Sequence, residues 1–174
     1  MDAQLLEILP YALAFIAGFI VKFVDWLDDE RKSKNPVKYL LAIFYGVLIG
    51  YLIGTANFSA IFLAALVAQV FARKIDTLAH RIGFITSAVS LLLFGLPSMD
   101  VALLIYFLVL AFLDEVDFVG WLRPLTEYRP FLKVGPLAPA LMFGRWEYFA
   151  GIIAFDMGYE LFNGVKKHIK RKGK

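Results

Sequence analysis

The sequence of 174 residues contains no cysteine, only two histidines and few charged residues, which make up 19% of the chain. The absence of cysteine excludes a small secreted domain held together by disulfides. A net charge of only +3 excludes a disordered or nucleic-acid-binding chain, so nucleic acid is not an expected partner. Repeats and low-complexity linkers are also lacking, which predicts one structural domain.

Hydrophobic residues are what the sequence has in excess. They make up 60% of the chain, against roughly 45–50% in a typical soluble domain, and the mean hydropathy is +0.70. A soluble protein of this size could not bury so much apolar surface, because its exterior must remain polar. The composition therefore predicts a multi-pass protein of the cell membrane, surrounded by membrane lipids.

Apolar stretches of a length suited to the bilayer recur along the chain. A hydrocarbon core of about 30 Å requires roughly 20 apolar residues in a helix. The predicted spans are 5–27, 39–56, 58–75, 82–98, 100–119 and a sixth at about 145–164. The predicted fold class is an all-α, polytopic membrane helical bundle of about six transmembrane helices. This domain covers residues 1–164, and a basic tail follows at 165–174.

The segment between the fifth and sixth spans is rich in proline and glycine. Pro136 and Pro139 lie within Val134–Gly144, which is too short for an ordinary span. We expect this stretch to be irregular and to dip into the membrane, shielded by other helices or lining a cavity, because unpaired backbone groups are not tolerated against lipid.

Lysine and arginine indicate the orientation in the membrane. The loops after the first, third and fifth spans hold ten basic residues and the alternate connections hold none: Arg31, Lys32, Lys34, Lys38, Arg73, Lys74, Arg81, Arg123, Arg129 and Lys133. The N-terminus is thus predicted outside. If 134–144 threads the membrane, the tail with its Lys and Arg returns to anionic headgroups on the cytoplasmic side. The alternative is a single further crossing that leaves the tail outside.

Small residues recur every four positions in two neighbouring spans. Gly46, Gly50 and Gly54 clear one face of the second span, and Ala64 and Ala68 belong to a similar series in the third. Because small residues allow close backbone approach, the two spans are expected to form a tight hairpin.

Acidic residues lie at the predicted cytoplasmic ends of several spans. Asp25, Asp114, Asp117 and Asp156 all have apolar neighbours, and an unpaired carboxylate at membrane depth is costly. If these four converge, hard oxygen ligands favour Mg²⁺ or Mn²⁺ as a cofactor. Asp114 and Asp117 are the predicted catalytic residues of such a centre.

Basic residues near these ends complete the predicted chemistry. Arg73, Arg123 and Arg129 are the candidates for binding an anionic substrate, because arginine binds phosphate in a bidentate manner. Lys22 lies one turn before Asp25 on the same helix face and is expected to pair with it or to extend to the interface. His80 is expected to cap a helix end rather than to bind a ligand.

Three classes of function remain open. The first is a divalent-metal-dependent enzyme acting on a phosphorylated lipid or isoprenoid at the cytoplasmic face, with metal neutralising the phosphate. The second is a cation or proton-coupled transporter or channel, and the third is a non-catalytic membrane scaffold. The acids cluster at one end rather than at several depths, which favours the enzyme over the transporter, although the sequence supplies no obvious nucleophile.

Overall fold

The computed structural model of the protein describes residues 3–30, 35–73 and 75–172, and every regular element in these ranges is helical. In chain order the elements are α1 (Ala3–Asp25), the π-helical turn η1 (Trp26–Glu30), α2 (Val37–Thr55), α3 (Ser59–Phe71), α4 (Leu78–Phe94), α5 (Val101–Glu115), the 3₁₀ turn η2 (Gly120–Leu122), α6 (Arg123–Tyr128), α7 (Phe131–Val134), α8 (Leu137–Phe143) and α9 (Trp146–Lys172). The predicted all-α fold class is confirmed for the described residues. The predicted boundary at residue 165 falls inside α9.

Side chains and glycines set several helix ends. The Thr77 hydroxyl accepts a hydrogen bond from the backbone N–H of His80 at the start of α4. The Asp100 carboxylate accepts one from Ala102 at 2.8 Å at the start of α5. Such caps satisfy N–H groups that have no partner within the helix. Gly95, at the end of α4, has a φ of +84°, a positive value that glycine adopts without steric cost.

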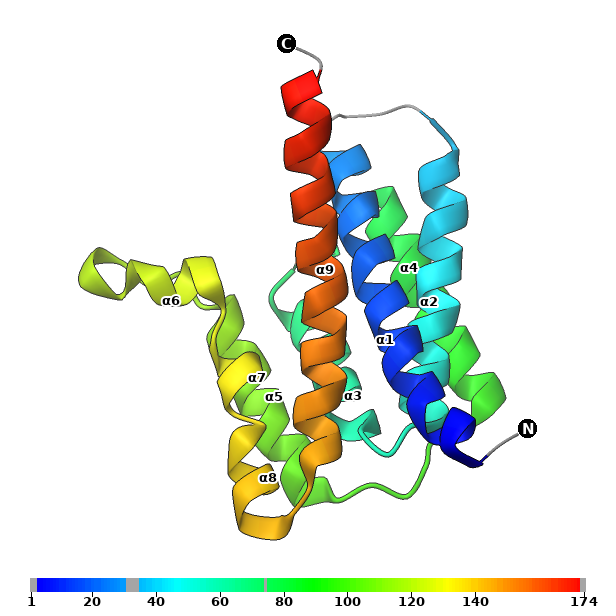
Figure 1. Ribbon diagram of the computed structural model, residues 1–174, viewed down its shortest axis with the longest axis vertical. Coiled ribbons are helices and arrows are strands. Elements are labelled where there is room, and N and C mark those ends of the chain that lie inside the picture. Colours follow the sequence, from blue (N-terminus) through cyan, green and yellow to red (C-terminus); the bar gives the residue numbers. More distant parts are fainter. Residues whose placement is uncertain (1–2, 31–34, 74, 173–174) are drawn as a thin grey trace.

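The helices form two adjoining groups (Figure 1). The main group contains α1 packed on α9 and α2 packed on α4, with α1 also contacting α2. The other group contains α5 with α7 and α8, and α3 joins the groups by packing on α5. The core includes Phe58, Phe62 and Phe107, and the Phe107 and Tyr148 rings lie 4.8 Å apart between centroids. Burial of aromatic side chains thus holds α3, α5 and α9 together.

The glycine stripe of α2 packs against α4, and the predicted hairpin contact with the alanines of α3 is wrong. A Cβ on Gly46 would lie 2.5 Å from the backbone oxygen of Gly83, and one on Gly50 would lie 2.5 Å from the Cβ of Ser90. Helix α4 offers its own small residues to α2, so the two backbones approach closely. The Ala64 side chain is fully buried in the cluster that contains Phe58 and Phe107.

Two helical stretches are long and apolar enough to cross a membrane, namely Leu6–Asp28 and Val37–Thr55. Other helices are shorter than predicted: α3 has 13 residues and α5 has 15. At about 1.5 Å per residue these two helices measure roughly 20 and 23 Å, less than a hydrocarbon core of about 30 Å. Length and composition therefore identify two of the predicted spans among the described residues.

The segment Val134–Gly144 is mostly helical, which corrects the prediction of an irregular backbone. Pro136 immediately precedes α8, and Pro139 lies in its first turn, where a missing N–H breaks no helical bond. The hydroxyl of Tyr106 donates to the backbone oxygen of Gly135 at the break between α7 and α8. Shielding is partial, because Pro136 and Pro139 are buried whereas 141–143 is exposed.

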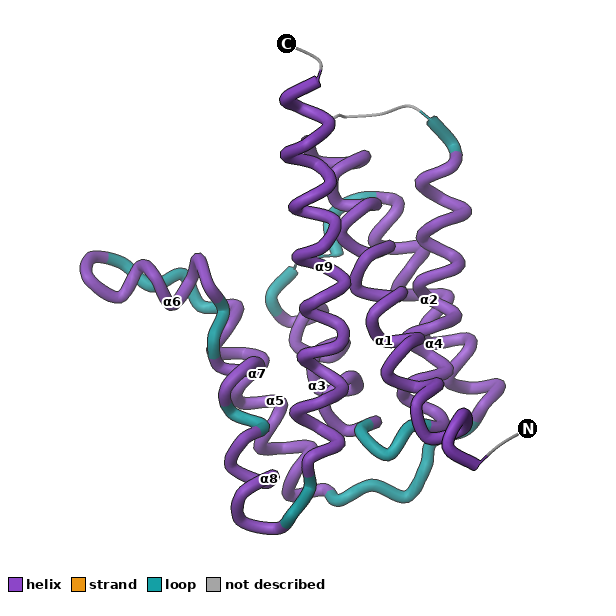
Figure 2. The backbone as a smooth tube through the Cα atoms, in the orientation of Figure 1, coloured by secondary structure: helices purple, strands orange, loops and turns teal. Residues whose placement is uncertain are grey.

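The course of α7 and α8 decides where α9 begins and ends. Figure 2 shows this pair running back alongside α5, after which α9 returns along the whole bundle. The C-terminal end of α9 therefore lies at the same end of the molecule as the end of α1 and the start of α2 (Figure 1). This end also carries Lys38 and Arg81, near the starts of α2 and α4. Lys133 lies instead on α7, where it pairs with Asp156 in the middle of α9. Arg31, Lys32, Lys34, Lys74 and Lys174 lie outside the described residues.

Candidate functional site

A network of polar side chains joins α1, α4 and α9. One carboxylate oxygen of Asp25, Oδ1, lies 3.1 Å from His80 Nε2. The other, Oδ2, accepts a hydrogen bond from the Tyr159 hydroxyl at 3.4 Å and lies 3.9 Å from Lys22 Nζ. Lys22 Nζ in turn donates to the Tyr159 oxygen at 2.8 Å. We call these four residues, together with Asp76, the relay network.

Burial distinguishes the inner members of the network from its outer one. The side chains of Lys22, Asp25 and His80 are 18%, 22% and 20% exposed, whereas that of Asp76 is 71% exposed. Asp76 Oδ1 lies 3.4 Å from His80 Nδ1, on the opposite side of the ring from Asp25. The imidazole of His80 therefore links a solvent-facing acid to a partly buried one.

The pKa of Asp76 is lowered from its usual value. Burial by itself would raise the pKa, but hydrogen bonds from the backbone N–H groups of Asp76 and Thr77 and from the side chain of His80 outweigh it. These donors stabilise the charged carboxylate. Asp76 thus stays ionised beside His80.

A second pair of charges lies close to the network. Lys38, at the start of α2, donates to Asp28 in η1, and both side chains are about nine-tenths buried. This ion pair links the two ends of the connection between α1 and α2. It engages the Oδ1 oxygen of Asp28, one of the acids that follow Asp25 in the sequence.

Asp114, a predicted catalytic and metal-binding residue, is occupied by the backbone of α7. Its Oδ1 accepts from the N–H of Phe131 at 2.9 Å and its Oδ2 accepts from the N–H of Leu132 at 2.8 Å. Asp114 is only 5% exposed. The contacts are those of a helix cap supplied from a neighbouring helix.

The other predicted metal ligands have separate surroundings. Asp156 Oδ1 lies 2.9 Å from Lys133 Nζ, and Asp117 is exposed beyond the end of α5. Asp25 belongs to the relay network. Among the described residues, no group of three or more His, Cys, Asp or Glu side chains is arranged to hold a metal ion.

The predicted substrate-binding arginines lie in two parts of the molecule. Arg73 follows α3 with a φ of +55° and is exposed. Arg123 is the first residue of α6 and Arg129 follows its last residue. Arg129 Nη1 lies 3.4 Å from Glu115 Oε1. Arg129 thus pairs with an acid at the end of α5.

Sequence reasoning identified part of the relay network. It anticipated the pairing of Lys22 with Asp25, which are one helical turn apart. It assigned His80 to a helix end and did not consider Tyr159, whose hydroxyl completes the network. One local indication of Tyr159 was present in the sequence: it lies three residues after Asp156 and immediately before Glu160.

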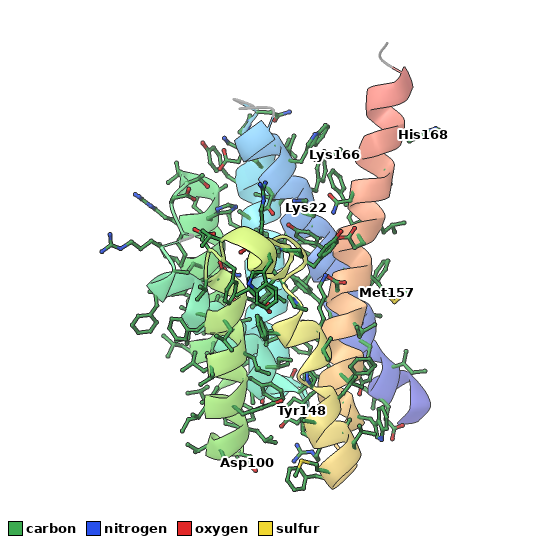
Figure 3. All side chains as sticks on the ribbon, turned by 90° about the vertical axis from the view of Figure 1, so that its left-hand side faces the viewer. Lys22, Asp100, Tyr148, Met157, Lys166 and His168 are labelled. Carbon is green, nitrogen blue, oxygen red and sulfur yellow. The ribbon has the colours of Figure 1, made fainter. Side chains whose placement is uncertain are left out.

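A cavity lies at the opposite end of the bundle. Its volume is about 1060 Å³, and Tyr11, Asp100, Arg145 and Tyr148 are among its lining residues. Figure 3 shows Lys22 toward one end of the molecule and Asp100 and Tyr148 toward the other. Arg145 donates to Glu147 and, at 3.0 Å, to the hydroxyl of Tyr148. The cavity is therefore separate from the relay network.

Comparison with known proteins finds no family model, no curated protein and no solved structure that matches the chain.

Proposed function

We propose that the chain is a multi-pass integral membrane protein and that it acts as a proton-coupled transporter. Large hydrophobic side chains on the outside of the bundle support the membrane placement: Leu40 is 67% exposed, Leu92 83% and Leu93 80%. In a membrane, lipid chains would cover these side chains, so their apolar surface would not be exposed to water. The basic end of the bundle then faces the cytoplasm.

The relay network is the observation on which the transport proposal rests. Ionisable side chains in membrane segments are costly, and those of proton pathways pair with one another. Here the groups form a series of contacts from Asp76 through His80 and Asp25 to Tyr159 and Lys22. Histidine exchanges protons near neutral pH, which suits it to the central position of the series.

The geometry supports a specific transfer of a proton. A proton taken up from water beside the ionised Asp76 carboxylate binds His80 Nδ1, and the proton on Nε2 passes to Asp25 Oδ1. The imidazole is neutral before and after the two steps, but its proton is on Nε2 before them and on Nδ1 after them. Protonation of Asp25 removes the negative charge beside Lys22 and weakens the tie between α1 and α9, which couples proton binding to helix movement.

The alternative enzyme hypothesis has less support from the geometry. Asp114 is engaged by two backbone N–H groups, and Asp156 is paired with Lys133. A divalent ion that used both would have to break these contacts.

Proton flux into liposomes tests the proposal. The purified protein is reconstituted with a pH-sensitive dye inside the vesicles, and flux is driven by a K⁺ diffusion potential. We expect flux in the native protein, a large reduction in His80→Gln and in Asp25→Asn, and native flux in His168→Gln. His168 is the matched control because it is the second of the two histidines and lies exposed on α9.

Melting temperatures of all variants separate loss of transport from loss of folding. Flux in folded His80→Gln equal to that of the native protein would contradict the relay. Native vesicles without flux, together with Mn²⁺-dependent release of phosphate from a phosphorylated lipid, would favour the enzyme instead.

A further inference from the structure

The segment between α5 and α7 forms an arm that leaves the bundle sideways. The arm comprises residues 116–130 and contains η2 and α6. Figure 1 shows α6 projecting across the direction of the long helices, near the level at which α5 ends. Outside its own turns the arm contacts α5, and the ring centroid of Phe118 lies 6.2 Å from that of Phe131 in α7.

Hydrogen bonds within the arm give it a defined shape. The Thr126 hydroxyl accepts from the backbone N–H of Phe118 at 2.7 Å and lies 3.3 Å from the backbone oxygen of Val116, to which it donates. At the far end, Arg129 reaches back to Glu115 at 3.4 Å. The arm is therefore tied at both of its ends to the end of α5.

The side chains that the arm exposes are unusual for contact with water. Trp121 is 87% exposed, Val119 83% and Tyr128 71%. Arg123 and Arg129 are also exposed and lie between or beside them in sequence. Tryptophan and tyrosine favour the interface between hydrocarbon and headgroups, and arginine binds phosphate.

We propose that the arm lies in the headgroup layer of the cytoplasmic leaflet, with its aromatic side chains at the hydrocarbon boundary and its arginines on lipid phosphates. This inference rests on the proposed membrane placement of the bundle. An element that runs across helices crossing the bilayer lies parallel to the membrane plane. The exposed aromatic residues and arginines of the arm favour the interface over the middle of the bilayer.

The charge of the arm fits headgroup phosphates. Arg123 and Arg129 provide two cations directly beside the exposed aromatic residues, and Lys133 follows just after the arm. A phosphate group in the headgroup layer can accept hydrogen bonds from the guanidinium groups while the rings stay in the less polar layer below. A second copy of the chain would instead need an acidic, apolar surface to match.

The absence of cysteine from the chain allows a single label to report the depth of the arm. Trp121→Cys, Leu92→Cys and Asn57→Cys are each labelled with an environment-sensitive fluorophore in liposomes. Quenching is then measured with lipids brominated near the headgroup, with lipids brominated near the chain ends, and with aqueous iodide. Leu92 reports the outer face of α4, and Asn57 reports the exposed turn between α2 and α3.

We expect the label at 121 to be quenched most by lipids brominated near the headgroup, the label at 92 by deeply brominated lipids, and the label at 57 by iodide. Quenching at 92 by bromolipid but at 121 by iodide alone would overturn the inference and leave the membrane placement intact. Protection at 121 from every quencher, lifted by diluting the protein in lipid, would overturn it in favour of a second copy. Iodide quenching at both positions would contradict the membrane placement itself.

The arginines provide a second measurement. With the label at 121, Arg123→Gln combined with Arg129→Gln should reduce quenching by headgroup-brominated lipid and increase quenching by iodide. Arg81→Gln is the control, because Arg81 is exposed at the same end of the bundle on α4. An equal effect of the Arg81 change, or no effect of the paired change, would contradict the phosphate contacts.

Discussion

Gly158 of α9 packs directly on the backbone carbonyl of Phe15 in α1, so closely that a Cβ on this glycine would lie 1.9 Å from the carbonyl oxygen. The reverse contact is equally close, since a Cβ on Gly18 would lie 2.0 Å from the oxygen of Phe155. These reciprocal glycines bring the two backbones together, with Gly158 immediately before Tyr159 and Gly18 about two helical turns before Asp25. The spacing of the relay network therefore depends on this crossing.

Gly158→Ala should destabilise the protein by about 1–3 kcal/mol, because the backbone of α1 cannot yield locally to an added methyl group. Gly164→Ala is the matched control on the same helix, since a Cβ there meets nothing within 4 Å. It should raise stability by about 0.5–1 kcal/mol through helix propensity. Thermal unfolding in detergent measures both, and equal behaviour of the two variants would contradict the packing.

Asp114→Asn should lower stability by about 1–3 kcal/mol, because an amide offers one acceptor where the carboxylate serves two backbone N–H groups. Asp117→Asn, at an exposed position, should change stability by less than about 0.5 kcal/mol. The melting temperatures decide this directly. If both residues held a metal ion, Asp114→Asn and Asp117→Asn would instead lose activity equally, and neither would lose much stability.

Acid should destabilise the protein in part through Asp76. Because its pKa is lower in the folded protein than in the unfolded chain, the carboxylate contributes stability above the unfolded pKa of about 3.9. That contribution disappears as the pH falls through the lower folded pKa. Melting temperatures of the native protein and of Asp76→Asn should differ by the same amount at every pH above about 5 and converge as the pH falls below about 4. A difference that does not shrink in acid would show that the ionisation of Asp76 is not coupled to folding.

The sequence by itself determined the features that depend on neighbouring residues. Apolar composition and turn residues predicted the helices and the breaks near Pro36, Asn57 and Gly95, because helix formation and termination are local. The pairing of Lys22 with Asp25 was equally predictable, since one helical turn separates them. The second half of the bundle was predicted less well: α5 ends at Glu115 rather than near 119, and the proline-rich segment is helical.

Only the tertiary structure decided which distant residues meet. The glycines of α2 could pack on any helix with small residues, and both α3 and α4 offer them. The residues around Asp114 in the sequence are equally compatible with a metal ligand. In the structure, however, α7 lies beside Asp114 and two of its backbone N–H groups donate to the carboxylate. His80 and Tyr159 reach Asp25 from distant parts of the chain because the α1–α9 and α2–α4 packings fix their separation. Spacing along the sequence carries no information about such contacts, since they arise from the way whole helix faces fit together.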